Sequence, residues 1–132
     1  MTNSDLAQDY RLRARGRRRV LDHLFKDGLF ADVVRESQEA CELALKSLIR
    51  EAGHLVPMSH DVSAKLIEIE SDLPAPVVAT LGRLCEISRR LRRDRELSFY
   101  GSEDVTPSKF FTKKDATEAI AMLDEVLKVL PL

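Results

Sequence analysis

The sequence has 132 residues, 44% of them hydrophobic and none of them Trp, which predicts one domain over 1–132 with a small core built on Leu, Ala and Val. The formal net charge of −1 gives no indication of nucleic-acid binding. No apolar run approaches the length of a membrane span. The two cysteines lack a metal-type spacing and no targeting segment is visible, so we expect reduced thiols in a cytoplasmic protein.

Arginine is unevenly distributed along the chain. Of the fourteen arginines, six lie within 11–19 and six more within 83–95. The first group belongs to a predicted helix over 4–26, whose apolar stripe also carries Arg17. This pattern is consistent with a solvated cationic face and also with a phosphate-binding surface that includes Arg17. Gly28 suits the left-handed residue that closes a helix, so the next helix should run antiparallel.

The stretch 32–52 contains neither Gly nor Pro and predicts the central helix of the fold. A broad apolar stripe lies on one side, and Glu36, Glu39, Lys46 and Arg50 lie on the other. Within the stripe, Cys41, Leu45 and Leu48 should be nearly fully buried. The residues expected to pack around them are Leu84, Leu91, Leu123 and Leu127.

Three further helices are predicted after the central one. A short helix runs over 62–73, a long one begins at Pro76, and the last begins after Thr112, which has Asp115 three residues later as in a capping box. A polar loop over 101–111 separates the last two. Because no β-type alternation of useful length occurs, the predicted fold is all-α: an antiparallel up-and-down bundle of four long helices plus one short helix.

An arginine continues the apolar stripe of the long helix that begins at Pro76. The stripe consists of Val77, Leu81, Leu84, Ser88 and Leu91, and its next position is Arg95. An arginine there must leave the core, pair with an acid or line a groove, and Arg92 flanks the same face. Near a helix end the first option is easy, and cations in a last turn also favour the helix dipole without any function.

Two stretches together resemble a HEPN domain. The first is QEACELALKSLI (38–49), preceded by KDGLFADV and followed by Gly53, Pro57 and His60-Asp61; the second is RDRELSFYGSEDVTPSKFFTKKDATEAIAMLDEVLKVL (93–130). The resemblance implies a helical bundle, a homodimer that pairs across the helices that bear the family's Arg motif, and a separately encoded minimal nucleotidyltransferase as partner in a toxin–antitoxin-like system.

HEPN ribonucleases resemble one another in an Arg four to six residues before a His, and some carry a Tyr two residues beyond that His. Here Arg93 and Tyr100 match the Arg and Tyr positions, but Ser98 stands where the His is expected. The group that would serve acid–base chemistry near neutral pH is therefore missing. An altered catalytic site would consist of Arg93, Glu96 and Tyr100, and the phosphate-binding set would be Arg92, Arg93, Arg95 and Arg17.

The remaining titratable residues do not supply the missing group. His54 lies before a loop, His60 reads as a helix-start residue, and His23 lies opposite the apolar stripe of its helix. No His, Cys or carboxylate spacing indicates a metal site, and no Gly-rich phosphate loop occurs, so we expect neither metal nor cofactor.

Three functions remain open. The first is a HEPN module with weak or no catalysis, which acts on RNA or nucleotide together with the nucleotidyltransferase. The second is a metal-independent endoribonuclease that uses the altered Arg/Glu/Tyr site. The third is a helical adaptor whose arginine faces bind an acidic protein. Cleavage of RNA separates the second from the others, and capture of a nucleotidyltransferase separates the first from the third.

Overall fold

The structure of the protein, a computed structural model, describes residues 1–57, 62–100 and 105–131, and for residues 99 and 100 it describes the backbone alone. The elements are α1 (Asn3–Lys26), α2 (Phe30–Glu51), α3 (Val62–Glu68), the 3₁₀ helix η1 (Glu70–Asp72), α4 (Ala75–Tyr100), α5 (Pro107–Phe110) and α6 (Lys113–Leu127). No strand occurs in these ranges, so the predicted all-α class is confirmed. Within them, no helix has the length and apolar character needed to cross a membrane.

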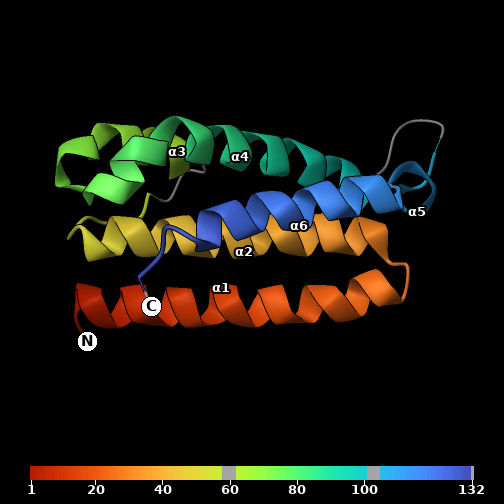
Figure 1. Cartoon of the computed structure of the whole chain (residues 1–132), viewed down its shortest axis with the longest axis horizontal. Coiled ribbons are helices and arrows are strands. Elements are labelled where there is room, and N and C mark those ends of the chain that lie inside the picture. Colours follow the sequence, from red (N-terminus) through yellow and green to blue (C-terminus); the bar gives the residue numbers. More distant parts are fainter. Residues whose placement is uncertain (58–61, 101–104, 132) are drawn as a thin grey trace.

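The four long helices run up and down, as predicted. In Figure 1, α2 lies between α1 on one side and α4 on the other, and α6 packs against α2. Gly28, at φ 74°, turns the chain between α1 and α2, which run antiparallel. The polar end of α4 and the short helix α5 lie at one end of the bundle, while α3 and η1 lie towards the other.

Helix α2 is the centre of the fold. Every residue from Phe30 to Arg50 is buried or half-buried, so neighbours cover even its polar side. Cys41, Leu45 and Leu48 are 2%, 0% and 4% exposed, which confirms their predicted burial. The four leucines expected around them, Leu84, Leu91, Leu123 and Leu127, are also buried.

The helix ends follow local chemistry that the sequence displays. In the Thr112–Asp115 capping box, the Asp115 amide donates to the Thr112 hydroxyl at 3.3 Å and the Thr112 amide donates to the Asp115 carboxylate at 2.8 Å. Thr2 and Asp5 form the same box at the start of α1. Both boxes satisfy amide groups that the first helical turn leaves without a helical partner.

The long helices begin within two residues of the predicted positions, and the larger differences lie in two of the connections. The predicted helix over 62–73 divides into α3 and η1, and the predicted loop over 101–111 contains α5, a single turn that begins at Pro107. Proline suits a first helical position, and one turn is too short to give a periodic pattern. Helix α6 ends at Leu127, after which the amides of Val129 and Leu130 bond three residues back.

Candidate functional site

Helix α4 carries the residues on which the sequence places function, and its two sides differ. The inner side, which faces the bundle, buries Leu84, Ile87 and Leu91 completely or nearly so. The outer side exposes Arg89 and Arg93 to solvent. The predicted site residues therefore divide according to the side of α4 on which they lie.

Arg95 lies on the inner side and pairs with an acid of the same chain. Its Nη2 is 2.7 Å from Oε1 of Glu39 on α2, and the two side chains are 34% and 29% exposed. Of the three options for an arginine on the apolar stripe, the structure selects pairing with an acid. Arg95 would have to leave Glu39 to bind a phosphate or to line a groove.

Arg93 lies on the outer side with 71% of its side chain exposed, and its Nε is 3.5 Å from the carboxylate of its neighbour Asp94. Arg92 is half-buried and lines a small polar cavity with Gln38 and Glu42 of α2. In the described part of the chain, neither a hydrogen bond nor an ion pair holds Arg92. Its guanidinium and that of Arg93 are the predicted phosphate ligands that remain most available.

Glu96 is exposed, and among the described residues no contact joins it to an arginine. It follows Arg93 by three residues, so both lie on the outer side of α4. Arg89 lies on this side too, one turn before Arg93, and is exposed. Arg89 was not among the predicted site residues. Its spacing of three and four residues to Arg92 and Arg93 would have placed it near them on the same helix.

Ser98 is 8% exposed, and its hydroxyl donates a hydrogen bond of 2.7 Å to the carbonyl oxygen of Arg95. It follows Arg93 by five positions along the helix, which corresponds to about 140° around the helix axis. Ser98 therefore lies on the inner side, and Arg93 points into solvent. Tyr100 is the last residue of α4, and its side chain lies outside the described part.

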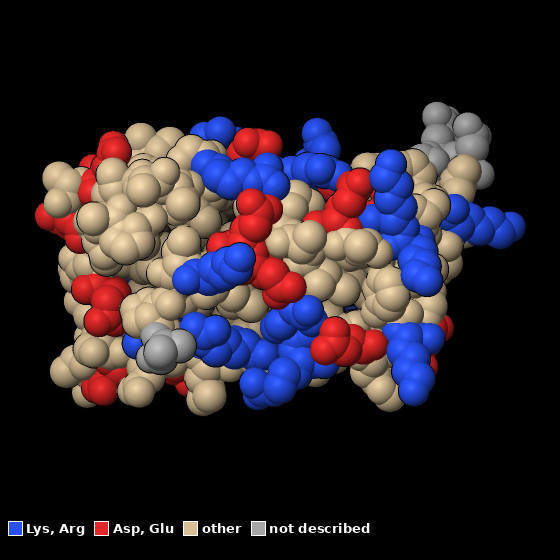
Figure 2. Space-filling model, viewed as in Figure 1, with Lys and Arg blue, Asp and Glu red and all other residues tan. Residues whose placement is uncertain are grey.

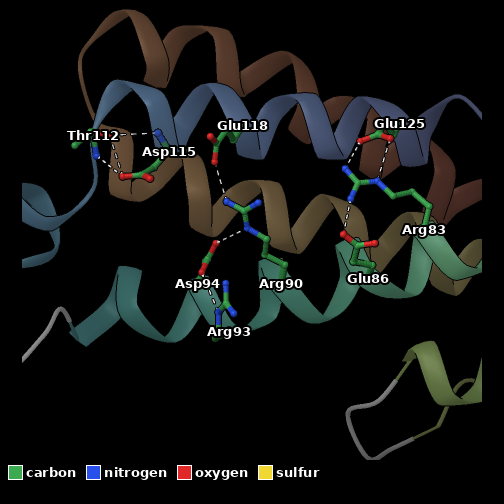
Figure 3. A network of polar contacts seen from close by, with 9 residues as sticks. All are labelled: Arg83, Glu86, Arg90, Arg93, Asp94, Thr112, Asp115, Glu118 and Glu125. Atoms are coloured by element: carbon green, nitrogen blue, oxygen red, sulfur yellow. Dashed lines mark hydrogen bonds and ion pairs between the residues drawn. The ribbon is translucent and has the colours of Figure 1, made fainter.

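Two further arginines of α4 connect it to α6, as Figure 3 shows. Arg83 donates to both carboxylate oxygens of Glu125 at 3.2 and 2.8 Å, and Arg90 contacts Glu118 at 2.8 Å. The hydrogen bonds from Arg83 lower the pKa of the Glu125 carboxyl from its ordinary value. These arginines join two helices and are not presented to a ligand.

The arginines of α1 are also largely occupied. Arg17 Nη1 lies 2.8 Å from Glu36 of α2, and Arg18 Nε lies 2.7 Å from Asp124 of α6. Arg17 would have to leave Glu36 to bind a phosphate. Figure 2 shows the result on one face of the molecule, where basic and acidic side chains alternate without forming a continuous basic surface.

The cysteines and histidines offer no reactive group at this site. Burial raises the pKa of the Cys41 thiol to about 12, and Cys85 is buried as well. His54 Nε2 lies 2.7 Å from Asp72, and His23 is exposed beside Asp27. His60 lies outside the described residues. In the described ranges, no three His, Cys, Asp or Glu residues are grouped so that they could hold a metal.

A cavity lies at the other end of the bundle, away from Arg89, Arg92 and Arg93. It measures about 440 Å³ and is lined mainly by apolar residues of α2, α4 and the chain end, among them Leu48, Pro74, Val77 and Val129. Its lining also includes three charged residues, Glu51, Asp72 and Lys128. None of the predicted site residues contributes to this cavity.

A comparison with protein families identifies the chain. The model of the HEPN domain matches residues 7–131, which is nearly the whole sequence. The chain belongs to the HEPN family. No curated protein and no solved structure matches it. In this HEPN domain Ser98, for which the sequence predicts the position of a histidine, is buried, and Arg93 is exposed on the opposite side of the helix.

Proposed function

We propose that this HEPN domain is a module with weak or no catalysis that binds RNA or nucleotide phosphates. The phosphate ligands are Arg92 and Arg93, with Arg89 added from the structure. In this proposal the module works in the cytoplasm as the partner of a separately encoded minimal nucleotidyltransferase, in a system of toxin–antitoxin type.

The burial and hydrogen bonding of Ser98 are the observations that support weak or absent catalysis. Its hydroxyl is nearly buried and is bound to a backbone carbonyl oxygen, so it is not oriented towards Arg93. A serine hydroxyl also titrates far above neutral pH and cannot replace an imidazole as general acid or base. Arg93 can stabilise phosphate charge, but the described residues around it supply no group that titrates near neutral pH.

The outer side of α4 supports phosphate binding. Arg89 and Arg93 are exposed on it, and the half-buried Arg92 lies at its edge towards α2. In the described contacts, no ion pair with an acid on another helix neutralises these three arginines. Such a surface offers charge without a means of reading bases, so binding should be weak, independent of sequence and strongly salt-dependent. Phosphate binding by this surface is compatible with RNA and with a nucleotide.

The HEPN family match supports the partnership with a nucleotidyltransferase, and the free, buried cysteines support a reducing compartment. Co-expression with a minimal nucleotidyltransferase encoded beside this chain tests the partnership, and we expect the two proteins to purify as one complex. A nucleotidyltransferase that elutes separately would contradict it. A partner that is acidic and unrelated to nucleotide chemistry would favour the adaptor function.

A homodimer is also part of the proposal, since the resemblance to HEPN proteins implies one. The sequence offers one cue for an interface at the end of α4, because an arginine on the apolar stripe would suit a groove between two subunits. Because Arg95 pairs with Glu39 within the chain, that cue no longer favours α4 over another face.

RNA cleavage by three proteins tests the catalytic part of the proposal: the natural chain, Ser98→His and Arg93→Ala. We expect no cleavage, or slow cleavage, by the natural chain. Ser98→His restores the Arg-x4-His-x-Tyr pattern, but its imidazole would start from a nearly buried position opposite Arg93. It should therefore reveal ribonuclease activity only if the end of α4 rearranges.

One observation favours the ribonuclease as the second candidate: Arg93 and Glu96 are both exposed on the outer side of α4. With Tyr100 they would form the altered catalytic site. Vigorous cleavage by the natural chain that Arg93→Ala abolishes would establish this function in place of the first. Vigorous cleavage that persists in Arg93→Ala would show that the residues around Arg93 are not the catalytic site.

A further inference from the structure

The cavity at the end of the bundle opposite α5 takes no part in the proposed function. It measures about 440 Å³, within the range of about 300–1,000 Å³ that is typical of small-molecule sites. The residues around it belong to the end of α2, to η1, to the start of α4 and to the chain after α6. Figure 1 shows these segments towards the same end of the bundle. The space between them is therefore large enough for a small organic molecule.

The lining of the cavity is mainly apolar. Eight of its eleven residues are Leu, Val, Ala or Pro, and two of these, Leu48 and Val77, belong to the buried core at 4% and 1% exposed. Pro74 and Pro76 have no amide donor, and the amide of Val77 donates to the carbonyl oxygen of Pro74 at 3.0 Å. The start of α4 therefore offers few hydrogen bonds, and a sugar or nucleotide would leave polar groups unpaired there. A hydrocarbon group needs no such bonds.

The chain after α6 is held in place as one wall of the cavity. Arg15 of α1 donates to the carbonyl oxygen of Pro131 at 3.1 Å, and the amides of Val129 and Leu130 each bond three residues back at 3.2 Å. These bonds order the wall before any ligand enters. Binding then costs less conformational entropy than it would at a loop that must first be ordered.

Of the three charged residues in the lining, Lys128 alone lacks an ion-pair partner in the described part of the chain. Glu51 Oε2 lies 3.1 Å from Nη1 of Arg11, and Asp72 Oδ2 lies 2.7 Å from Nε2 of His54. Lys128 is exposed, and within the described residues neither an ion pair nor a hydrogen bond holds its ammonium group. An anionic group of a ligand can approach this ammonium without displacing another partner.

Glu125, three residues before Lys128, does not occupy its ammonium group. The pKa of the Glu125 carboxyl is lowered mainly by hydrogen bonds from Arg83 and further by the charge of Lys128. Arg83 donates to both carboxylate oxygens of Glu125, at 3.2 and 2.8 Å, and no described contact joins Glu125 to Lys128. The donors of Lys128 therefore remain available at the edge of an apolar cavity.

We propose that this cavity binds a small aliphatic carboxylate, with its hydrocarbon chain against Leu48, Val77 and Val129 and its carboxylate at the ammonium group of Lys128. One ammonium matches the single charge of a carboxylate, whereas a phosphate group would keep charge and acceptors that no neighbouring donor satisfies. The site lies at the opposite end of the bundle from Arg89 and Arg93, so it is independent of the proposed phosphate binding.

Four probes test the chemical class of the ligand: octanoate, 1-octanol, octylamine and acetate. Titrations of the natural chain near neutral pH, followed by the NMR signals of its methyl groups, should give octanoate a dissociation constant of about 0.1–1 mM. We expect 1-octanol and octylamine to bind at least about fivefold more weakly, because the first lacks the charge and the second has the opposite charge. Acetate, which has no hydrocarbon chain, should not bind at these concentrations.

Lys128→Gln tests the residue that selects the carboxylate, and Lys114→Gln is its matched control. Lys114 is an exposed lysine near the other end of α6, so both substitutions remove one positive charge from the same region of the chain. Lys128→Gln should weaken octanoate binding at least about fivefold and leave 1-octanol binding unchanged. Lys114→Gln should change neither.

Val129→Phe tests the cavity itself, because the larger side chain reduces the space for a ligand. It should weaken octanoate and 1-octanol alike, whereas Val20→Phe, at an exposed position of α1, should weaken neither. The methyl signals of Leu48 and Val77 in the natural chain locate the ligand without any substitution. Octanoate should shift these signals and leave those of Leu12, which is 66% exposed on α1, unchanged.

Each alternative outcome overturns a stated part of this inference. If octanoate does not bind, or shifts methyl groups away from Leu48 and Val77, the cavity is not its site. If octylamine binds more tightly than octanoate, the acids Glu51 and Asp72 select the ligand and the carboxylate class is wrong. If Lys128→Gln leaves octanoate binding unchanged, Lys128 does not hold the carboxylate. None of these results affects the proposed phosphate binding, which is measured on RNA.

Discussion

The two groups of arginines, one on α1 and one on α4, are equal in number in the sequence but differ in their surroundings. On α1, Arg11, Arg17 and Arg18 reach carboxylates on α2 and α6. On α4, Arg83, Arg90 and Arg95 likewise reach carboxylates of other helices.

The groups differ in their other members. Arg89, Arg92 and Arg93 of α4 have no such partner in the described contacts, whereas on α1 Arg13 lies 4.0 Å from Asp9 and Arg15 donates to the carbonyl oxygen of Pro131.

This difference shows that arginine density along a sequence does not identify a ligand-binding surface. Within each group, what distinguishes a paired arginine from an available one is the position of acids that are distant in sequence, such as Glu36 for Arg17 and Glu39 for Arg95. A paired guanidinium mainly fixes the orientation of two helices, whereas an unpaired one keeps its donors for a ligand.

The largest expected effect on stability comes from the apolar core, and the cost of removing an arginine pair is judged against it. Leu45 is 0% exposed at the centre of α2, and Leu45→Ala should lower the free energy of unfolding by about 2–5 kcal/mol. Urea unfolding measures the loss. If Arg17→Ala or Arg18→Ala costs as much as Leu45→Ala, the ion pairs to α2 and α6, and not the apolar core, hold α1 in place.

The second prediction compares the two arginine groups directly as RNA ligands. Replacing Arg89, Arg92 and Arg93 together by alanine should weaken binding of single-stranded RNA about 10–100-fold and reduce the salt slope by about 2, because each phosphate contact releases counterions. A triple alanine variant of Arg13, Arg15 and Arg19 removes the same charge from α1 and is the control. Equal losses would mean that only net charge matters.

The third prediction concerns stability and compares the inner and outer sides of α4. Arg95→Ala leaves Glu39, which is 29% exposed, without its partner and should cost about 1–2 kcal/mol. Arg93→Ala removes an exposed side chain and should change stability by less than about 0.5 kcal/mol. Chemical unfolding of both variants checks this, and equal costs would contradict the assignment of Arg95 to a structural pair.

Much of the fold is predictable from this sequence because its signals are local. The glycine after α1, the capping box before α6 and the apolar stripe of α2 are each contained within a few turns of chain. The division of 62–73 and the single turn at Pro107 were missed because such short elements give no periodicity.

The site was less predictable because its arrangement depends on contacts between distant residues. The pattern placed Arg95 on the apolar stripe correctly, but only the packing of α4 on α2 identifies Glu39 as its partner. Likewise the sequence placed Ser98 at the expected histidine position, and the structure adds that its hydroxyl is bound to the carbonyl oxygen of Arg95.

The smallest expected effect tests whether the exposed pairs between α4 and α6 contribute to stability. Arg83 lowers the pKa of Glu125, so the pair stabilises the fold above the carboxyl's ordinary pKa and loses this contribution as the pH falls through the lowered value. Both side chains are nearly half exposed, at 44% and 47%, so solvent screening limits the contribution to about 0.5 kcal/mol or less. Glu125→Gln should therefore be slightly less stable than the natural chain at neutral pH and equally stable in acid. High salt should also reduce the difference, since it screens exposed pairs. Urea unfolding at the two pH values measures the difference, and a loss that persists in acid would trace the effect to packing rather than to charge.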